Sequence, residues 1–255
     1  MNRIIKIILL DILKNKIIVS YTLILALLSW GSFMLEDNTA KGLLTILNVI
    51  LFTVPLVSIL FSTIYIYNSS EFIELLLSQP IKRKKIWISL FAGLSIAMFL
   101  AFFLGAGIPL LINAPDMAGL MMLLSGSLIS IVFVSLAFLS CILTRDKAKG
   151  IGLAILFWMY FAILFDALVL FLLFQFAEYP IEEAMVAITA SSPIDLARIQ
   201  ILLHLDQSAM MGYTGAIFKD FFGTAIGLLI SFLLLILWIA VPFVISIRKF
   251  ERKDL

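Results

Sequence analysis

A single acidic residue stands inside one of the long apolar stretches of the sequence. Asp166 lies between Phe165 and Ala167, in a run from residue 151 to 176 that contains no other charged side chain. A carboxylate within the hydrocarbon of a membrane is costly unless it faces protein or water. Asp166 is therefore a candidate for a direct role in transport or coupling. The alternative is a neutral or hydrogen-bonded acid that serves helix packing.

A second set of side chains capable of chemistry follows between residues 200 and 211. Gln200 and His204 lie one helical turn apart, and Met210 and Met211 are close to them in sequence. Imidazole and thioether groups suit copper, Cu(I) in particular. The same residues are also common packing residues at a membrane interface. A copper-handling site and simple packing both remain open, and no metal ligands or bound cofactor are assigned to the chain.

The motifs of several enzyme classes are missing from the sequence. No glycine is followed by Lys-Ser or Lys-Thr, so the chain is not expected to hydrolyse nucleotide itself. With one histidine there is no His-Glu-x-x-His motif. The lone Cys141 can form neither an internal disulfide nor a cysteine metal cluster, and it is interpreted as a packing residue. These observations favour a transport subunit that is not an enzyme.

The composition identifies the environment in which these residues must be positioned. Of the 255 residues 63% are apolar and 13% are charged, and the mean hydropathy is +1.18. A helix needs roughly 20 apolar residues to cross the hydrocarbon core of a membrane. Six stretches meet this length, so we predict an all-α, polytopic membrane protein forming one domain over residues 1–255. The predicted spans are residues 17–35, 43–67, 86–112, 117–143, 151–176 and 224–247.

Basic residues orient these spans. Fifteen of the 18 Lys and Arg residues lie before the first span, between the second and third, after the fourth, and after the sixth. Only Lys41, Arg198 and Lys219 fall on the other side. The positive-inside rule then places both termini in the cytoplasm. Residues 1–16 carry their basic side chains opposite an apolar face, which indicates a helix lying in the cytoplasmic interface. A simple basic flank of the first span is the alternative.

One cytoplasmic segment, residues 68–85, has the pattern of a short helix. Ser69 or Ser70 can cap it, Glu71 and Glu74 fall near its positive end, and Pro80 ends it. Leu75, Leu76 and Leu77 form its apolar part, and a basic cluster follows. A soluble partner protein could bind such a helix. An ordinary basic loop is the alternative.

The longest external segment, residues 177–223, is too long for an unstructured connection. Ser192 is a predicted helix N-cap, followed by Pro193 at the first helical position and by Asp195. We expect a helical extracytoplasmic cap, or a pair of helices that dip into the outer interface. The hypothesis is that this cap docks an extracytoplasmic protein. The residues assigned to that contact are Asp195, Arg198, His204, Asp206, Met210 and Met211.

Together these features resemble ABC-2 type permeases. Within that class the chain is similar to the membrane subunits of the ABC transporters that mature nitrous-oxide reductase. The external motif, residues 192–206 followed by 211–223, is the specific part of the resemblance, which covers most of the chain from about Glu71 onward. Weaker matches are Leu77-Ser-Gln-Pro80, residues 103–109, Lys149-Gly-Ile-Gly-Leu-Ala154, Trp158 and Phe165-Asp-Ala-Leu168.

The resemblance implies a homodimer in the bacterial cytoplasmic membrane, carrying two copies of a cytoplasmic ABC ATPase that binds ATP and Mg. It also implies an extracytoplasmic β-helical partner and a role in assembling the copper centres of the reductase. The cytoplasmic helix would then couple to the ATPase through Glu71, Glu74, Leu75, Leu76, Leu77 and Gln79. No nucleic acid is implied. What passes across the bilayer stays open: it is copper, a sulfur species or a mechanical signal.

Two other functions are alternatives to this one. An ABC-2 exporter of a lipid, drug or polysaccharide would differ in what residues 177–223 contact. A stand-alone secondary transporter would need ionisable or unwound elements near the membrane midplane, for which Asp166 alone is thin support.

Overall fold

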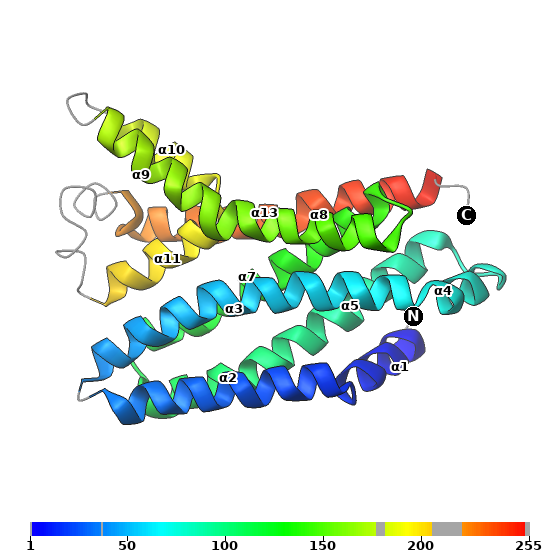
Figure 1. The fold of residues 1–255 in the computed structure, drawn as a ribbon, viewed down its shortest axis with the longest axis horizontal. Coiled ribbons are helices and arrows are strands. Elements are labelled where there is room, and N and C mark those ends of the chain that lie inside the picture. The colour runs from blue at the N-terminus through cyan, green and yellow to red at the C-terminus, as the bar shows by residue number, and fades with distance from the viewer. Residues whose placement is uncertain (1, 37, 177–181, 206–220, 253–255) are drawn as a thin grey trace.

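The computed structural model describes residues 2–36, 38–176, 182–205 and 221–252, and this part of the chain is helical without strands. Its helices form an elongated bundle (Figure 1). Six of them, counting helices that run on through a π-helical turn as one, are long and apolar enough to cross a membrane. The predicted all-α fold with six spans is confirmed.

The six spans match the predicted stretches to within a few residues at most ends. Spans one and two are α2 (Lys16–Leu35) and α3 (Thr39–Asn68). Span three consists of α5 (Arg83–Phe102), the π-helical turn η1 (Phe103–Gly107) and α6 (Ile108–Asn113). Span four is α7 (Met117–Leu143). Span five combines α8 (Lys147–Met159), the π-helical turn η2 (Tyr160–Leu164) and α9 (Phe165–Gln175), and span six is α13 (Ala225–Arg252).

Span four is the centre of the bundle. In its most apolar stretch 78% of the residues are buried, against 11% in span five and 17% in span six. Helix α7 packs against α3, α5 and α13. Ser135 Oγ donates to the Ile239 carbonyl at 2.7 Å, and Trp87 Nε1 of span three donates to Ser246 Oγ of span six at 3.0 Å. Spans five and six therefore leave large apolar faces uncovered by this chain.

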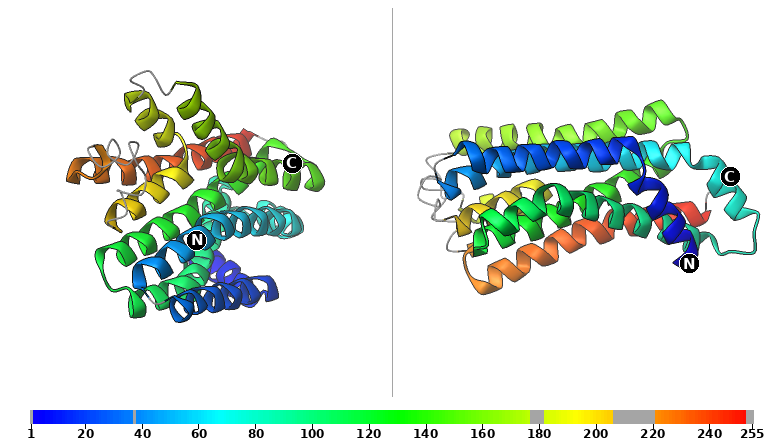
Figure 2. Two further views of the ribbon diagram at one scale, coloured as in Figure 1. Left: turned by 60° about the vertical axis from the view of Figure 1, so that its left-hand side comes forward. Right: turned by 90° about the horizontal axis from the view of Figure 1, so that it is seen from below.

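One end of the bundle gathers the elements predicted to be cytoplasmic. The N-terminus, α4 (Ser70–Leu77) and the C-terminal end of α13 lie together there (Figure 1, and the right-hand view of Figure 2). Helix α1 (Asn2–Leu13) lies across this end and packs on α5, with Ile8 and Ile12 buried. A Cβ at Gly93 would lie 2.7 Å from the Ile8 side chain, so glycine allows this close approach.

Two local departures from regular helix lie near the middle of the bundle. Pro55 inside α3 has no N–H to bond to the carbonyl of Leu51. The indole Nε1 of Trp158 donates to the adjacent Phe52 carbonyl at 3.2 Å, which ties span five to this point of span two. The turn η2 follows directly after Trp158 and Met159 and ends immediately before Phe165 and Asp166. π-helical turns inside helices are frequent at functional sites.

Candidate functional site

The segment between spans five and six folds into two helices that meet at a sharp bend. Helix α10 (Glu182–Ala190) and helix α11 (Pro193–His204) are bent by 112° relative to each other. Helix α11 turns back into the bundle and packs against α7, α13 and α3. The predicted helical cap, or pair of helices that dips into the outer interface, contains these two helices, and most of α11 is buried against the bundle.

The start of α11 is fixed by the signals that its sequence carries. Ser192 Oγ accepts a hydrogen bond from the backbone N–H of Asp195 at 3.3 Å, and Pro193 occupies the first turn. A side-chain oxygen at this position satisfies one of the backbone donors that the first turn leaves without a partner. This capping prediction is confirmed, and it places Asp195 at the buried start of the helix.

Asp195 and Arg198 converge with Asp166 of span five. Arg198 Nη1 donates to Asp166 Oδ1 at 2.8 Å and to Asp195 Oδ1 at 3.0 Å. The Arg198 and Asp166 side chains are 29% and 35% exposed, and the Asp195 side chain is 10% exposed. The acid identified in the sequence therefore has a cationic partner 32 residues away. The sequence pattern predicts that Arg198 belongs to an external docking surface, whereas in the structure it forms this ion pair.

The cluster leaves polar groups without partners. Two carboxylates share one guanidinium, and Asp195 Oδ2 is buried with no hydrogen-bond partner among the described residues. Two turns into the same helix, Gln200 accepts from Ser125 Oγ at 3.1 Å, while its Nε2 is buried without a partner. Unpaired buried polar atoms are uncommon in folded proteins, and a bound water or ion or a functional role can account for them.

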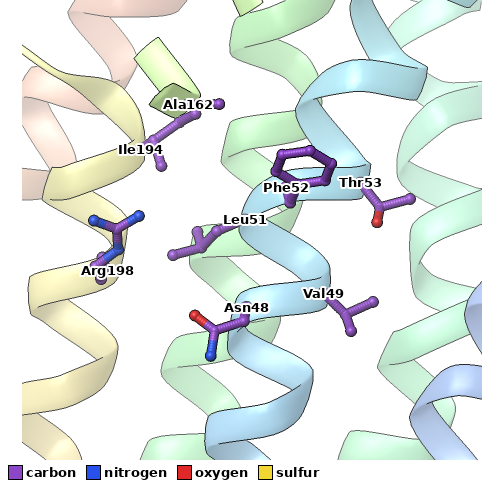
Figure 3. Close-up of a pocket in the computed structure, with 8 residues that line it drawn as sticks. All are labelled: Asn48, Val49, Leu51, Phe52, Thr53, Ala162, Ile194 and Arg198. Carbon is purple, nitrogen blue, oxygen red and sulfur yellow. The ribbon is translucent and has the colours of Figure 1, made fainter. Parts of the chain in front are cut away.

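A cavity of about 450 Å³ adjoins the cluster (Figure 3). Its wall is formed by α3 on one side and by η2 and α11 on the other, and Arg198 lies at its α11 side. Asn48 and Thr53 add two further polar side chains to an otherwise apolar lining. The complete lining is Asn48, Val49, Leu51, Phe52, Thr53, Ala162, Ile194 and Arg198. The cluster therefore joins span five, the re-entrant helix and a cavity that borders span two.

The residues assigned to external docking do not form one open surface. Asp195 is buried, and Arg198 is engaged with Asp166, because the helix carrying both lies inside the bundle instead of on its surface. His204 Nδ1 lies 2.7 Å from the Gln200 carbonyl of the preceding turn. Asp206, Met210 and Met211 lie outside the residues that the structure describes. A docking role therefore remains a prediction for the exposed parts of this segment only.

Helix α4, at the end of the bundle predicted to be cytoplasmic, has the opposite character. Glu71, Glu74, Leu75 and Gln79 are exposed. Ile73 and Leu76 are buried against the bundle, and Leu77 is partly buried. Leu76 therefore anchors α4 to its own chain and does not belong to a partner surface. Ser69 occupies the N-cap position, but its hydroxyl makes no capping hydrogen bond.

A second cavity, of about 330 Å³, lies behind α4. Ile73 and Glu74 line it from α4, Trp87 from span three, and Arg145 from the connection between spans four and five. The ring of Trp87 stacks on Phe250 at 4.2 Å. Helix α4 is thus connected to the bundle by a few apolar contacts beside an incompletely filled space. Such a support permits movement of α4 relative to the spans.

The six spans, with the short helix α4 at one end and the buried helix α11, define a multi-span membrane protein. The family model for ABC-2 family transporter proteins matches residues 14–255, so the chain belongs to that family. The chain is also similar to the probable ABC transporter permease protein NosY of Stutzerimonas stutzeri. The two are 25% identical over 276 residues, which cover 95% of each chain. Homologous permeases of this family are transport subunits whose ATPase is a separate chain.

Proposed function

We propose that this chain is the permease subunit of an ABC transporter in the bacterial cytoplasmic membrane and takes part in copper-centre maturation of nitrous-oxide reductase. A homodimer would carry two copies of a cytoplasmic ATPase, which binds ATP and Mg. The observation that supports coupling to an ATPase is α4, which projects from the bundle at the end predicted to be cytoplasmic and exposes Glu71, Glu74 and Leu75.

The structure of α4 suits the transmission of movement. Its exposed side carries two carboxylates and an apolar side chain, which can pair with a groove that has a basic rim. Its buried side rests on Ile73 and Leu76. A displacement of α4 by the ATPase would therefore reach spans two and three, because α4 packs on α3 and α5. This is the mechanical route that we propose.

The role in nitrous-oxide reductase maturation is supported by similarity to the NosY permease over nearly the whole chain. An extracytoplasmic β-helical protein is the proposed partner on the other side, contacting the segment between spans five and six. The runner-up is an ABC-2 exporter of a lipid, drug or polysaccharide. The cavity beside Arg198 and Asn48 favours that second function, because it offers a partly polar space next to apolar spans.

The test of the coupling proposal is co-purification with the partner ABC ATPase. The double variant Glu71→Lys with Leu75→Asp should reduce the retained ATPase at least tenfold and abolish reductase copper loading, while the yield of folded permease stays unchanged. Glu251→Lys is the matched control, because Glu251 is an exposed acid at the same end of the bundle. Undiminished ATPase retention in the double variant would refute the assignment. If the double variant loses the ATPase as expected but reductase copper loading stays normal, the exporter function is favoured.

A further inference from the structure

The ion-pair cluster between span five and the re-entrant helix is short of one positive charge. Asp166 and Asp195 both accept a hydrogen bond from Nη1 of Arg198. With both carboxylates ionised, the cluster has two negative charges and one positive charge, and its net charge is −1. Since their Oδ1 atoms lie 2.8 and 3.0 Å from the same nitrogen, the two carboxylates are within about 6 Å of each other. Like charges at this distance repel strongly where water is scarce.

The unpaired atom of the cluster identifies where the missing charge belongs. The Asp195 side chain is 10% exposed, and its Oδ2 is buried without a hydrogen-bond partner among the described residues. Its other oxygen is already bonded to Arg198. A buried carboxylate oxygen without a donor is costly, and this cost is removed when the oxygen takes up a proton or contacts a cation.

No other described side chain supplies that charge. The elements that pack against α11 carry further titratable and charged residues besides the cluster itself. They are His204 of α11, Glu182 and Glu183 of α10, Tyr160 of η2, Lys41, Tyr65 and Tyr67 of α3, Asp116 at the start of α7 and Cys141 within it, and Arg248, Lys249, Glu251 and Arg252 at the far end of α13. His204 is bonded to the Gln200 carbonyl. None of the described side chains in this set forms an ion pair with Asp166 or Asp195.

We propose that the cluster of Asp166, Arg198 and Asp195 is a binding site for one additional monovalent cation. The cation is either a proton carried by Asp195 Oδ2 or a sodium ion held between the two carboxylates. Proton uptake breaks one O–H bond of a hydronium ion, which becomes water, and forms one O–H bond on Asp195 Oδ2. The cluster is then neutral, with Arg198 paired to the remaining carboxylate. The same neutrality results when sodium is bound.

The site links cation binding to the position of α11. When the cation is bound, α11 is held against span five without net charge. When it leaves, the two carboxylates repel each other and the contact between α11 and span five weakens. Because η2 and α11 also form the wall of the 450 Å³ cavity, cation release changes the support of that wall. This inference concerns the membrane chain itself and does not depend on the ATPase or the reductase.

The test measures the thermal stability of the purified full-length chain in lipid nanodiscs. Unfolding midpoints are recorded from pH 5.5 to 8.5, in sodium chloride and in choline chloride at equal ionic strength. A folded cluster that retains its proton to higher pH than the unfolded chain loses stability as the pH rises. For a proton site, the midpoint of the native chain should fall by about 5 °C over this range in both salts.

The variant Asp166→Asn tests whether the cluster is the site, and the comparison of sodium with choline separates the proton from sodium. It removes the excess negative charge, so its midpoint should vary with pH by less than half as much as that of the native chain. If sodium is the ligand, sodium should raise the midpoint of the native chain relative to choline, and Asp166→Asn should abolish that difference. Glu251→Gln, which neutralises an exposed acid at the far end, should behave like the native chain. Equal pH and sodium responses in the native chain and Asp166→Asn would overturn the proposal.

A second measurement keeps the proposal testable if Asp166→Asn does not fold. Infrared spectra of the native chain near neutral pH should show the carbonyl band of one protonated carboxyl group, which Asp195→Asn should lack. A native chain with neither that band nor a sodium effect on its unfolding midpoint contains no such site.

Discussion

Helices α4 and α11 have similar sequence signals but lie in opposite environments. Each follows a serine at its N-cap position and carries an acid in its first turn, Glu71 in α4 and Asp195 in α11. Glu71 is exposed at the end of the bundle, whereas Asp195 is buried and bonded to Arg198. The same local pattern thus produces an open polar surface in one place and an internal ion-pair cluster in the other.

The difference teaches that the partner of a charge, and not its position in a helix, decides its use. Helix α4 carries no basic residue, so its acids remain available to another molecule. Helix α11 carries Arg198 one turn after Asp195 and meets Asp166 from span five. Its charges are therefore used within the chain. We expect variants of α11 to affect folding and variants on the exposed side of α4 to affect assembly.

The largest effect is expected for Arg198→Met. This variant keeps much of the side-chain volume but leaves two carboxylates close together without a cation. Removal of one partner from a fully buried pair costs about 3 to 5 kcal/mol. Because Arg198 and Asp166 are partly exposed, the expected loss is about 2 to 3 kcal/mol. The measurement is the unfolding midpoint and the yield of folded protein in nanodiscs.

Arg198→Lys is the control for that experiment, because it retains the charge but not the planar guanidinium. It should recover a large part of the stability that Arg198→Met loses. If Arg198→Met is as stable as the native chain, the cluster does not hold α11 in place and the contrast between the two helices disappears.

A pair of adjacent leucines tests the other helix. Leu76 is 7% exposed and Leu75 is 66% exposed. Leu76→Asp buries a charge at the contact between α4 and the bundle, so it should free α4 locally at a cost of about 2 kcal/mol. Leu75→Asp should leave α4 in place and weaken only ATPase binding. Hydrogen exchange of residues 70–78 distinguishes the two, and equally fast exchange in both variants would contradict the assignment of faces.

The two N-cap serines give a smaller and sharper comparison. Ser192 bonds to the backbone N–H of Asp195, whereas Ser69 makes no side-chain capping bond. Ser192→Ala should therefore destabilise the chain by about 1 kcal/mol, and Ser69→Ala should have no measurable effect. Both are read from unfolding midpoints in the same lipid. Equal effects of the two variants would show that the capping hydrogen bond of the Ser192 hydroxyl does not stabilise the chain.

Much of the fold was predictable, because the length of each apolar run and the distribution of Lys and Arg depend on local sequence alone. The span limits and the start of α11 at Ser192 belong to this part. The pairing of Asp166 with Arg198 could not be predicted in this way. It depends on the 112° bend between α10 and α11, which turns a helix from the external segment back into the bundle. The burial of Leu76 likewise depends on where α4 packs.

The smallest effect is expected for His204→Ala, at the end of α11. His204 Nδ1 lies 2.7 Å from the Gln200 carbonyl, so the ring supports the last turn of the helix, where a cationic or donor group is worth less than about 1 kcal/mol. If this support is its whole role, His204→Ala should lower the unfolding midpoint slightly and leave reductase copper loading within about twofold of the native level. His204→Asn keeps a side-chain donor at the same position and should restore part of the stability. Loss of copper loading in both variants, with ATPase retention unchanged, would instead assign His204 to copper handling. The end of α11 would then act outside the chain, as α4 is proposed to do, and the contrast between the two helices would apply only to the start of α11.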